Sequence, residues 1–170
     1  GAVDSEQCVV VPDGVTMPPP AQDADAVLSR YHLRQREYVL FVGRLEYRKN
    51  LSHIVSAVKG FPAITLVCVG EPGFGYEESV VPELAKMDQQ RMRVISRIAD
   101  ADLSALYANA LVALQPSWDE GFGLPVLEAM AHGCPVITSN CGATREVGEG
   151  AAVLVDPAAP EQSRPALERL

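Results

Sequence analysis

The chain has 170 residues, of which 48% are apolar and 6% aromatic, and its formal net charge at pH 7 is −8. This length fits one domain that buries roughly two-thirds of its unfolded surface. The acidic balance argues against nucleic acid or an anionic membrane as the main partner. Because no apolar run approaches about 18 residues and no signal-peptide pattern opens the sequence, we expect no membrane insertion.

Short apolar runs alternate along the chain with segments of helical periodicity. We expect strands at residues 8–12, 38–43, 64–70, 93–96, 111–114, 136–138 and 152–155. We expect helices at 23–31, 51–58, 76–87, 102–110, 125–133 and 160–170, and about one helical turn within 141–147. This alternation predicts an α/β fold, a Rossmann-like doubly wound parallel sheet of about six strands. Ligands of such sheets bind beyond the carboxyl ends of the strands.

The four cysteines, Cys8, Cys68, Cys134 and Cys141, form no Cys-x-x-Cys pair. Reduced thiols in a cytoplasmic protein are the preferred interpretation. No paired Cys and His spacing predicts zinc, and no thiol has an evident His partner. We therefore expect neither a metal nor a catalytic cysteine.

The stretch from 116 to 135 contains the strongest site signal. Gly121 and Gly123 precede a helix that Pro125 favours at its start, so free backbone amides face a phosphate or a hydroxyl-rich ligand there. Glu120 and Glu128 bracket this loop, and carboxylates accept hydrogen bonds well from vicinal hydroxyls. The alternative for Glu128 is a structural role near the helix N-terminus, where a carboxylate is favoured by roughly 0.3–1 kcal/mol.

A second signal lies at residues 43–50, directly after an apolar strand. Arg44 suits bidentate binding of phosphate oxygens, and Lys49 adds a positive charge at the next helix start. Since a cation at a helix N-terminus is unfavourable by itself, a bound anion explains Lys49 better than helix stability does. The alternative is a solvated loop in which Glu46 pairs with Arg48, and we expect Arg48 at the surface. Asn50 is the expected N-cap of the helix.

Other polar motifs favour structural roles. The 70–75 loop lacks the G-x-G-x-x-G spacing of NAD sites and is interpreted as a flexible loop near the ligand. The Asp-x-Asp pairs at 23–25 and 100–102 fit helix capping better than metal binding. Trp118 is expected to pack rather than to stack on a sugar, and His132 to be structural. The roles of Arg145 and Glu146 stay open.

Three segments together resemble the carboxyl-terminal half of a retaining glycosyltransferase of the group 1 set (family four). This family has the GT-B arrangement of two Rossmann-like domains. The segments are residues 43–50, 100–110 and 116–135. Glu120 and Glu128 match the E-x7-E motif of the family, within Glu-Gly-Phe-Gly-Leu-Pro-Val-Leu-Glu.

The resemblance extends over residues 8–157. Residues 11–15, Val-Pro-Asp-Gly-Val, look like the interdomain Pro-Asn-Gly-Val of the family, with Asp13 in place of Asn. Residues 154–157 are similar to its late strand. The resemblance implies that residues 8–170 are the nucleotide-sugar-binding domain and that 1–7 are a tag remnant or an interdomain linker.

The resemblance implies a role for each matching residue. Arg44 and Lys49 would hold the donor diphosphate and stabilise the charge on the leaving group, and Glu120 would hold donor-sugar hydroxyls. These three are the expected catalytic residues, and Glu128 would accept hydrogen bonds from the ribose. Backbone near Arg97 and Ile98 would contact the base. The other expected donor contacts are Gly43, Gly70, Gly121, Phe122, Gly123 and Leu124. Neither a metal nor a cofactor is implied, and no carboxylate stands out as a nucleophile.

The family's amino-terminal acceptor domain and terminal crossing helix are absent from this sequence. We therefore expect a chain that is inactive alone and works with its missing acceptor domain, in the cytoplasm, with membrane contact only through that domain. The Glu-Gly-Phe-Gly-Leu-Pro version is frequent in mannosyltransferases, which favours GDP-mannose as donor of the transferred hexose. The alternatives are a non-catalytic nucleotide-sugar-binding module and half of a nucleotide-sugar epimerase.

Overall fold

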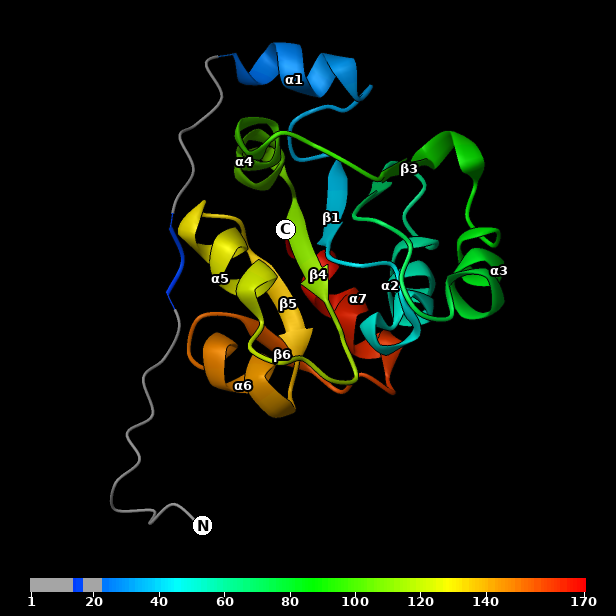
Figure 1. Cartoon of the computed structure of the whole chain (residues 1–170), viewed down its shortest axis with the longest axis vertical. Coiled ribbons are helices and arrows are strands. Elements are labelled where there is room, and N and C mark those ends of the chain that lie inside the picture. Colours follow the sequence, from blue (N-terminus) through cyan, green and yellow to red (C-terminus); the bar gives the residue numbers. More distant parts are fainter. Residues whose placement is uncertain (1–13, 17–22) are drawn as a thin grey trace, which may run out of the picture.

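Six parallel strands form the centre of the structure, a computed structural model that describes residues 14–16 and 23–170 (Figure 1). Their order in the sheet is β3-β2-β1-β4-β5-β6, and every pairing is parallel. The strands are β1 (Tyr38–Val42), β2 (Thr65–Val69), β3 (Met92–Ile95), β4 (Val112–Gln115), β5 (Val136–Ser139) and β6 (Val153–Val155). This confirms the predicted sheet, while the strand expected at residues 8–12 lies outside the described residues.

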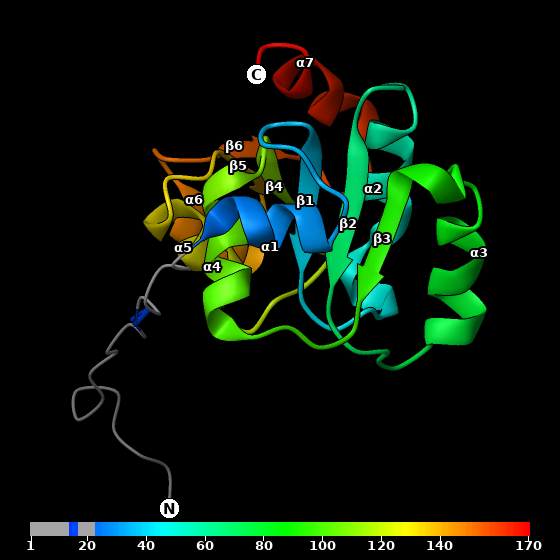
Figure 2. The ribbon, with the colours of Figure 1, turned by 90° about the horizontal axis from the view of Figure 1, so that it is seen from above.

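Strand β1 shows why the sheet is covered on both faces. All five of its residues are buried, and their side chains alternate between two apolar clusters. Val39 and Phe41 contribute to the cluster formed with α2 (Leu51–Val58), α3 (Val81–Leu84) and α7 (Arg164–Leu167). Leu40 and Val42 contribute to the cluster on the opposite face, and Figure 2 shows the two layers of helices. The helices of that second layer are α1 (Ala24–Arg30), α4 (Asp100–Asn109), α5 (Leu124–Ala131) and α6 (Gly142–Gly148).

Two long helices that the periodicity predicts are interrupted, and a proline lies in each break. The segment expected as one helix at 76–87 is a π-helical turn, η3 (Tyr76–Val80), followed by the short α3. Pro82 has no N–H to donate to the carbonyl four residues earlier, so a regular helix cannot run through it. The segment expected at 160–170 is likewise a 3-10 turn, η5 (Pro160–Ser163), followed by α7, with Pro165 at the helix start. The two remaining 3-10 turns are η2 (Tyr47–Lys49) and η4 (Gln89–Arg91).

The loops that follow β1 and β2 are bonded to each other at the carboxyl edge of the sheet. Leu45 N–H donates to Glu71 O at 2.9 Å, and Gly73 N–H donates to Leu45 O at 3.0 Å. At Gly70, where φ is +151°, a Cβ atom would lie 2.0 Å from Gly43 O. Only glycine fits this close approach, so Gly70 has a structural reason to be there apart from any ligand.

Candidate functional site

Arg44 lies in the loop directly after β1 and is exposed. Its guanidinium makes no hydrogen bond or ion pair with any residue in the described part of the chain. A planar cation held at the carboxyl edge of a parallel sheet, free of internal partners, suits an incoming phosphate or carboxylate. Arg44 therefore lies exposed at the carboxyl end of β1, and its binding of a diphosphate stays a prediction.

Lys49 and Glu120 form a buried ion pair at the same edge. Lys49 Nζ lies 2.5 Å from Glu120 Oε1 and 2.6 Å from Glu120 Oε2. The two side chains are 7% and 8% exposed, and Ser117 Oγ donates a further hydrogen bond to Oε1 at 2.9 Å. A Cβ on Gly43 would lie 3.7 Å from Lys49 Cε, so the lysine stem passes alongside this glycine. Lys49, predicted to bind the diphosphate, and Glu120, predicted to bind the sugar, are therefore paired with each other in this structure.

The sequence pointed to both residues but not to the ion pair between them. Lys49 follows β1 and Glu120 follows β4, and they are 71 positions apart. What brings them together is the strand order, in which β4 lies directly beside β1. A prediction of the strand order that placed β4 beside β1 would have indicated this pair.

Arg48 extends the pair towards the surface. Its Nε lies 2.6 Å from Glu46 Oε1, its Nη1 lies 3.6 Å from Glu120 Oε2, and the side chain is 46% exposed. The surface position of Arg48 and its pairing with Glu46 are both confirmed. The 43–50 segment is nevertheless not a fully solvated loop, because Lys49 within it is buried.

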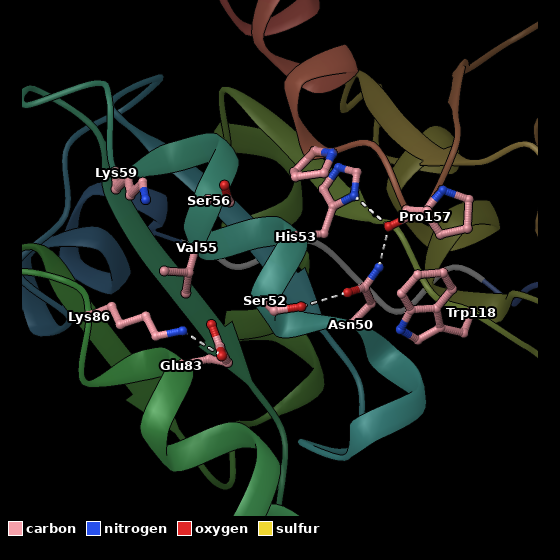
Figure 3. A pocket seen from close by; sticks show the side chains of 12 residues that line it. Asn50, Ser52, His53, Val55, Ser56, Lys59, Glu83, Lys86, Trp118 and Pro157 are labelled. Atoms are coloured by element: carbon pink, nitrogen blue, oxygen red, sulfur yellow. Dashed lines mark hydrogen bonds and ion pairs between the residues drawn. The ribbon is translucent and has the colours of Figure 1, made fainter.

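Asn50 joins three segments instead of capping a helix with its side chain. It is the N-cap residue of α2, as predicted, but its backbone is left-handed, φ 56° and ψ 50°, and its side chain makes no capping hydrogen bond. Its Nδ2 donates to Pro116 O at 3.0 Å. The same Nδ2 donates to Pro157 O at 2.8 Å, and Ser52 Oγ donates to Asn50 Oδ1 (Figure 3). Asn50 therefore fixes the chain next to Lys49 against the loops after β4 and β6.

His53 is a buried partner in the same network, and no sequence motif predicted this role. Its Nδ1 lies 3.1 Å from Pro157 O and its Nε2 2.8 Å from Ser163 Oγ. A carbonyl oxygen only accepts, so Nδ1 carries the proton and Nε2 accepts from the serine hydroxyl. Burial lowers the pKa of His53, opposed more weakly by the bond to Pro157 and by nearby Glu161 and Asp156. His53 is therefore neutral at pH 7 and ties α2 to η5.

A groove of about 420 Å³ lies beside this network, with Trp118 on its edge (Figure 3). Trp118 was expected to pack rather than to stack on a sugar, and it packs only in part, since the residue is 41% exposed. Its backbone N–H donates to Arg48 O at 2.8 Å, which holds the residue at the surface. The groove is otherwise lined mainly by α2, with hydroxyls of Ser52 and Ser56, and by the 157–160 segment.

The glycine-rich loop leads into α5 as predicted. Gly123 precedes the helix with φ +91°, and Pro125 lies in the first turn. A Cβ on Gly121 would meet nothing within 4 Å, so the loop is open at that point. Phe122 is half-buried and Leu124 is 38% exposed. The loop follows β4 directly and therefore lies at the same edge as Arg44.

Glu128 borders a cavity of about 200 Å³ beside α4 and α5. The other residues that line it are Thr16, Asp100, Leu103, Ser104, Tyr107 and His132. The hydroxyl of Tyr107 donates to Glu128 Oε2 at 2.9 Å. Burial, followed by the nearby Glu128 carboxylate, raises the pKa of Tyr107 well above its usual value. His132 stacks on Tyr107 with ring centroids 5.2 Å apart, in keeping with its expected structural role.

The residues expected near the base lie after β3. Arg97 is exposed, with Nε 2.8 Å from Glu71 Oε1, and Ile98 packs against the cluster that contains α4 and α5. The structure thus accounts for both side chains without a ligand, and their backbone contact with a base stays a prediction.

The two Asp-x-Asp pairs differ in their roles. Asp23 accepts from Ala26 N–H at 2.9 Å and caps α1, as predicted. Capping by Asp100 or Asp102 is wrong, because α4 begins at Asp100 and Asp102 instead pairs with Arg30 at 2.5 Å. Within residues 14–16 and 23–170, no group of three or more His, Cys, Asp or Glu side chains is arranged to hold a metal ion. In the same residues, no helix has the length and apolar character needed to span a membrane.

Residues 30–170 match the family described as "Glycosyl transferases group 1". The chain is 36% identical to the O-antigen chain mannosyltransferase B of Escherichia coli over 77% of this chain and 36% of that protein. It is also 36% identical to the MMP alpha-(1->4)-mannosyltransferase of Mycolicibacterium hassiacum, over 99% of this chain and 41% of that protein. The chain therefore spans about two fifths of the length of these relatives.

Solved structures show the same fold. Sucrose-phosphate synthase from Thermosynechococcus elongatus superposes with a TM-score of 0.71 and 30% identity, over 88% of this chain and 40% of that one. HepE of Anabaena, solved with UDP and glucose, superposes with a TM-score of 0.76 over 86% of this chain and 41% of that one. At 21% identity, this second likeness concerns the fold alone. With a parallel Rossmann-like sheet and a family match over residues 30–170, the chain belongs to the group 1 glycosyl transferases.

Proposed function

We propose that the chain is the donor-binding domain of a retaining glycosyltransferase, which moves a hexose from a nucleoside-diphosphate sugar to an acceptor. The observation that carries this proposal is the position of Arg44. Its exposed guanidinium has no partner among the described residues and shares one sheet edge with the Lys49–Glu120 pair. Together these groups provide two cations for a diphosphate and one carboxylate for hydroxyls.

The chemistry follows from where charge develops. When the bond between sugar and diphosphate breaks, negative charge grows on the leaving diphosphate and positive charge on the sugar ring. Arg44 binds the diphosphate oxygens in bidentate fashion. Lys49 redirects one of its ammonium N–H donors from Glu120 to the same oxygens. Cations fixed in advance at that position lower the barrier electrostatically.

Glu120 changes partners in this proposal. Its two oxygens are engaged by Lys49 and Ser117 in the structure. As Lys49 shares its ammonium with the diphosphate, a carboxylate oxygen of Glu120 becomes free to accept from hydroxyls of the donor sugar. The backbone amides of residues 121–124 would assist, and Glu128 would bind the ribose.

GDP-mannose is the donor that we propose to test first. Two of the relatives named above are mannosyltransferases, and the Glu120–Pro125 segment favours the same group. UDP-glucose is tested beside it, as a donor that differs from GDP-mannose in both base and sugar. We further propose that the protein acts in the cytoplasm, without a metal or cofactor, together with an acceptor domain, and that this chain alone transfers no sugar.

The test is product analysis with the full-length protein, GDP-mannose or UDP-glucose, and a glycan and lipid extract as acceptor. We expect release of the nucleoside diphosphate and an α-linked product from the α-linked donor, as read by NMR. A β-linked product would overturn retention. Epimerised donor formed without acceptor would favour the epimerase alternative, and donor that binds but stays intact would favour a non-catalytic module.

A further inference from the structure

Glu128 is held at two points by residues to which nothing above assigns a part in ligand binding. Tyr107, on α4, is 1% exposed, and its hydroxyl donates to Glu128 Oε2 at 2.9 Å. A buried phenol needs an acceptor, and the carboxylate of Glu128 on α5 is the one that it has. The bond therefore fixes the direction of the Glu128 side chain relative to α4.

His132 contacts the backbone carbonyl of Glu128. Its Nδ1 lies 2.7 Å from the backbone oxygen of Glu128, and its ring stacks on Tyr107 at an interplanar angle of 22°. Because a carbonyl oxygen only accepts, Nδ1 carries the proton. Nε2 is buried and has no hydrogen-bond partner in the described chain. An unpaired buried nitrogen is costly, so packing against Tyr107 is the gain that keeps the ring in this place.

This arrangement leaves Glu128 prepared to accept from a ligand. Tyr107 uses one acceptor position of Oε2, while Oε1 has no partner among the described residues. A carboxylate has about four acceptor positions on its two oxygens, so both oxygens keep capacity for a further hydrogen bond. Two oxygens fixed in one plane at the border of a 200 Å³ cavity fit two neighbouring hydroxyls.

We propose that Tyr107 and His132 are positioning residues, which hold the Glu128 carboxylate in the orientation that binds the cis-diol of a ribose. The inference rests on the proposed function, since it takes a nucleotide as the ligand. It goes beyond it in making selection of a ribose depend on two side chains that need not touch the ligand. Because an oriented acceptor loses less freedom on binding, the orientation adds to affinity only where both hydroxyls are present.

The test compares ribonucleotides with analogues that lack the diol. GDP and UDP, each beside its 2′,3′-dideoxy form, are titrated by calorimetry into the wild-type chain, Tyr107→Phe and His132→Phe. Both phenylalanine variants keep an aromatic ring in the stack and remove one hydrogen bond to Glu128. Tyr38→Phe is the matched control, because this second buried tyrosine donates its hydrogen bond to Leu106 O on the same helix and not to Glu128.

For the wild type we expect the ribonucleotide to bind at least tenfold more tightly than its dideoxy form. Tyr107→Phe should reduce this ratio threefold or more and leave the affinity for the dideoxy form within twofold. His132→Phe should reduce the ratio in the same direction, whereas Tyr38→Phe should lower the melting temperature without changing the ratio.

A role in stability alone would weaken both ligands equally or only lower the melting temperature, and would overturn the inference. Tighter ribonucleotide binding in Tyr107→Phe would also overturn it, because the tyrosine would then be competing for Glu128. If Tyr107→Phe does not fold, the ratio in His132→Phe decides. If the wild type binds none of the four nucleotides, the proposed function fails and the inference with it. An unchanged ratio in variants that bind would defeat the inference alone.

Discussion

The ammonium of Lys49 lies within 2.6 Å of both carboxylate oxygens of Glu120, although the two residues are 71 positions apart in the chain. Both side chains are more than nine-tenths buried, so each charge depends on the other for its solvation. The pair joins the loops after β1 and β4, which are the loops expected to hold the diphosphate and the sugar. The Lys49–Glu120 pair therefore links two parts of the candidate site in the folded chain before any ligand binds.

Removing one member of this pair should be costly. We expect Lys49→Met to lower the free energy of unfolding by about 3 kcal/mol, because Glu120 is left buried without its main counter-charge. Urea denaturation at pH 7 measures the change. The double variant Lys49→Met with Glu120→Gln should recover more than half of the loss, and a double variant as unstable as the single one would show that the charges are not coupled.

His53 should make the stability depend on acid. Burial lowers its pKa below the 6.5 of an ordinary histidine, so the unfolded chain takes up a proton before the folded chain does. Its contribution to stability is complete above about pH 6.5 and is lost as the pH falls through the lower, folded pKa. Urea denaturation between pH 7.5 and 5.0 should therefore show a smaller decline in His53→Asn than in the wild type. His32→Asn, at an exposed histidine, serves as control, and a decline unchanged in His53→Asn would contradict the assignment.

Gly70 should not tolerate a side chain. A Cβ there would lie 2.0 Å from Gly43 O, with backbone φ at +151°, so Gly70→Ala must push apart the loops after β1 and β2. We expect a loss of about 3 kcal/mol or more, the sum of steric overlap and backbone strain. Gly121→Ala is the matched control, because its Cβ would meet nothing within 4 Å. Equal melting temperatures for the two variants would refute the close approach.

Arg44 should matter for binding and not for folding. Since it has no partner in the described chain, Arg44→Ala should change the free energy of unfolding by less than about 0.5 kcal/mol. It should weaken the binding of a nucleoside diphosphate by about 1.5–3 kcal/mol, the cost of losing a hydrogen bond to a charged group. Arg34→Ala, in the loop before β1 and thus at the opposite edge of the sheet, is the control. Equal affinities for the two variants would remove Arg44 from the site.

Most of the fold followed from the sequence because its signals are local. Each buried strand is a short apolar run, as in Tyr38–Val42, and each is followed by a segment of helical period. The interruption at Pro82 was also readable in principle, since a missing donor breaks a helix whatever surrounds it. The left-handed backbone of Asn50 was not, because its side chain is drawn to Pro116 and Pro157 from distant parts of the chain.

In the candidate site, too, the residue types could be chosen from the sequence, whereas their partners could not. The residues at 44, 49, 120 and 128 were proposed from the sequence because their side-chain chemistry does not depend on their surroundings, and their roles stay predictions. Their partners depend on strand order and helix packing, which is why the Lys49–Glu120 pair and the Tyr107–Glu128 bond were not foreseen. The exposure of Trp118 was missed for the same reason, since the loop of Arg48 determines it.

Calorimetric titration of this chain with GDP, UDP and ADP tests the central claim most directly. If the chain is a donor-binding domain, one of the three nucleotides should bind, and both Arg44→Ala and Glu128→Ala should weaken it at least tenfold. Well-folded wild-type protein that binds none of them, or binds one of them equally well in both variants, would contradict the claim.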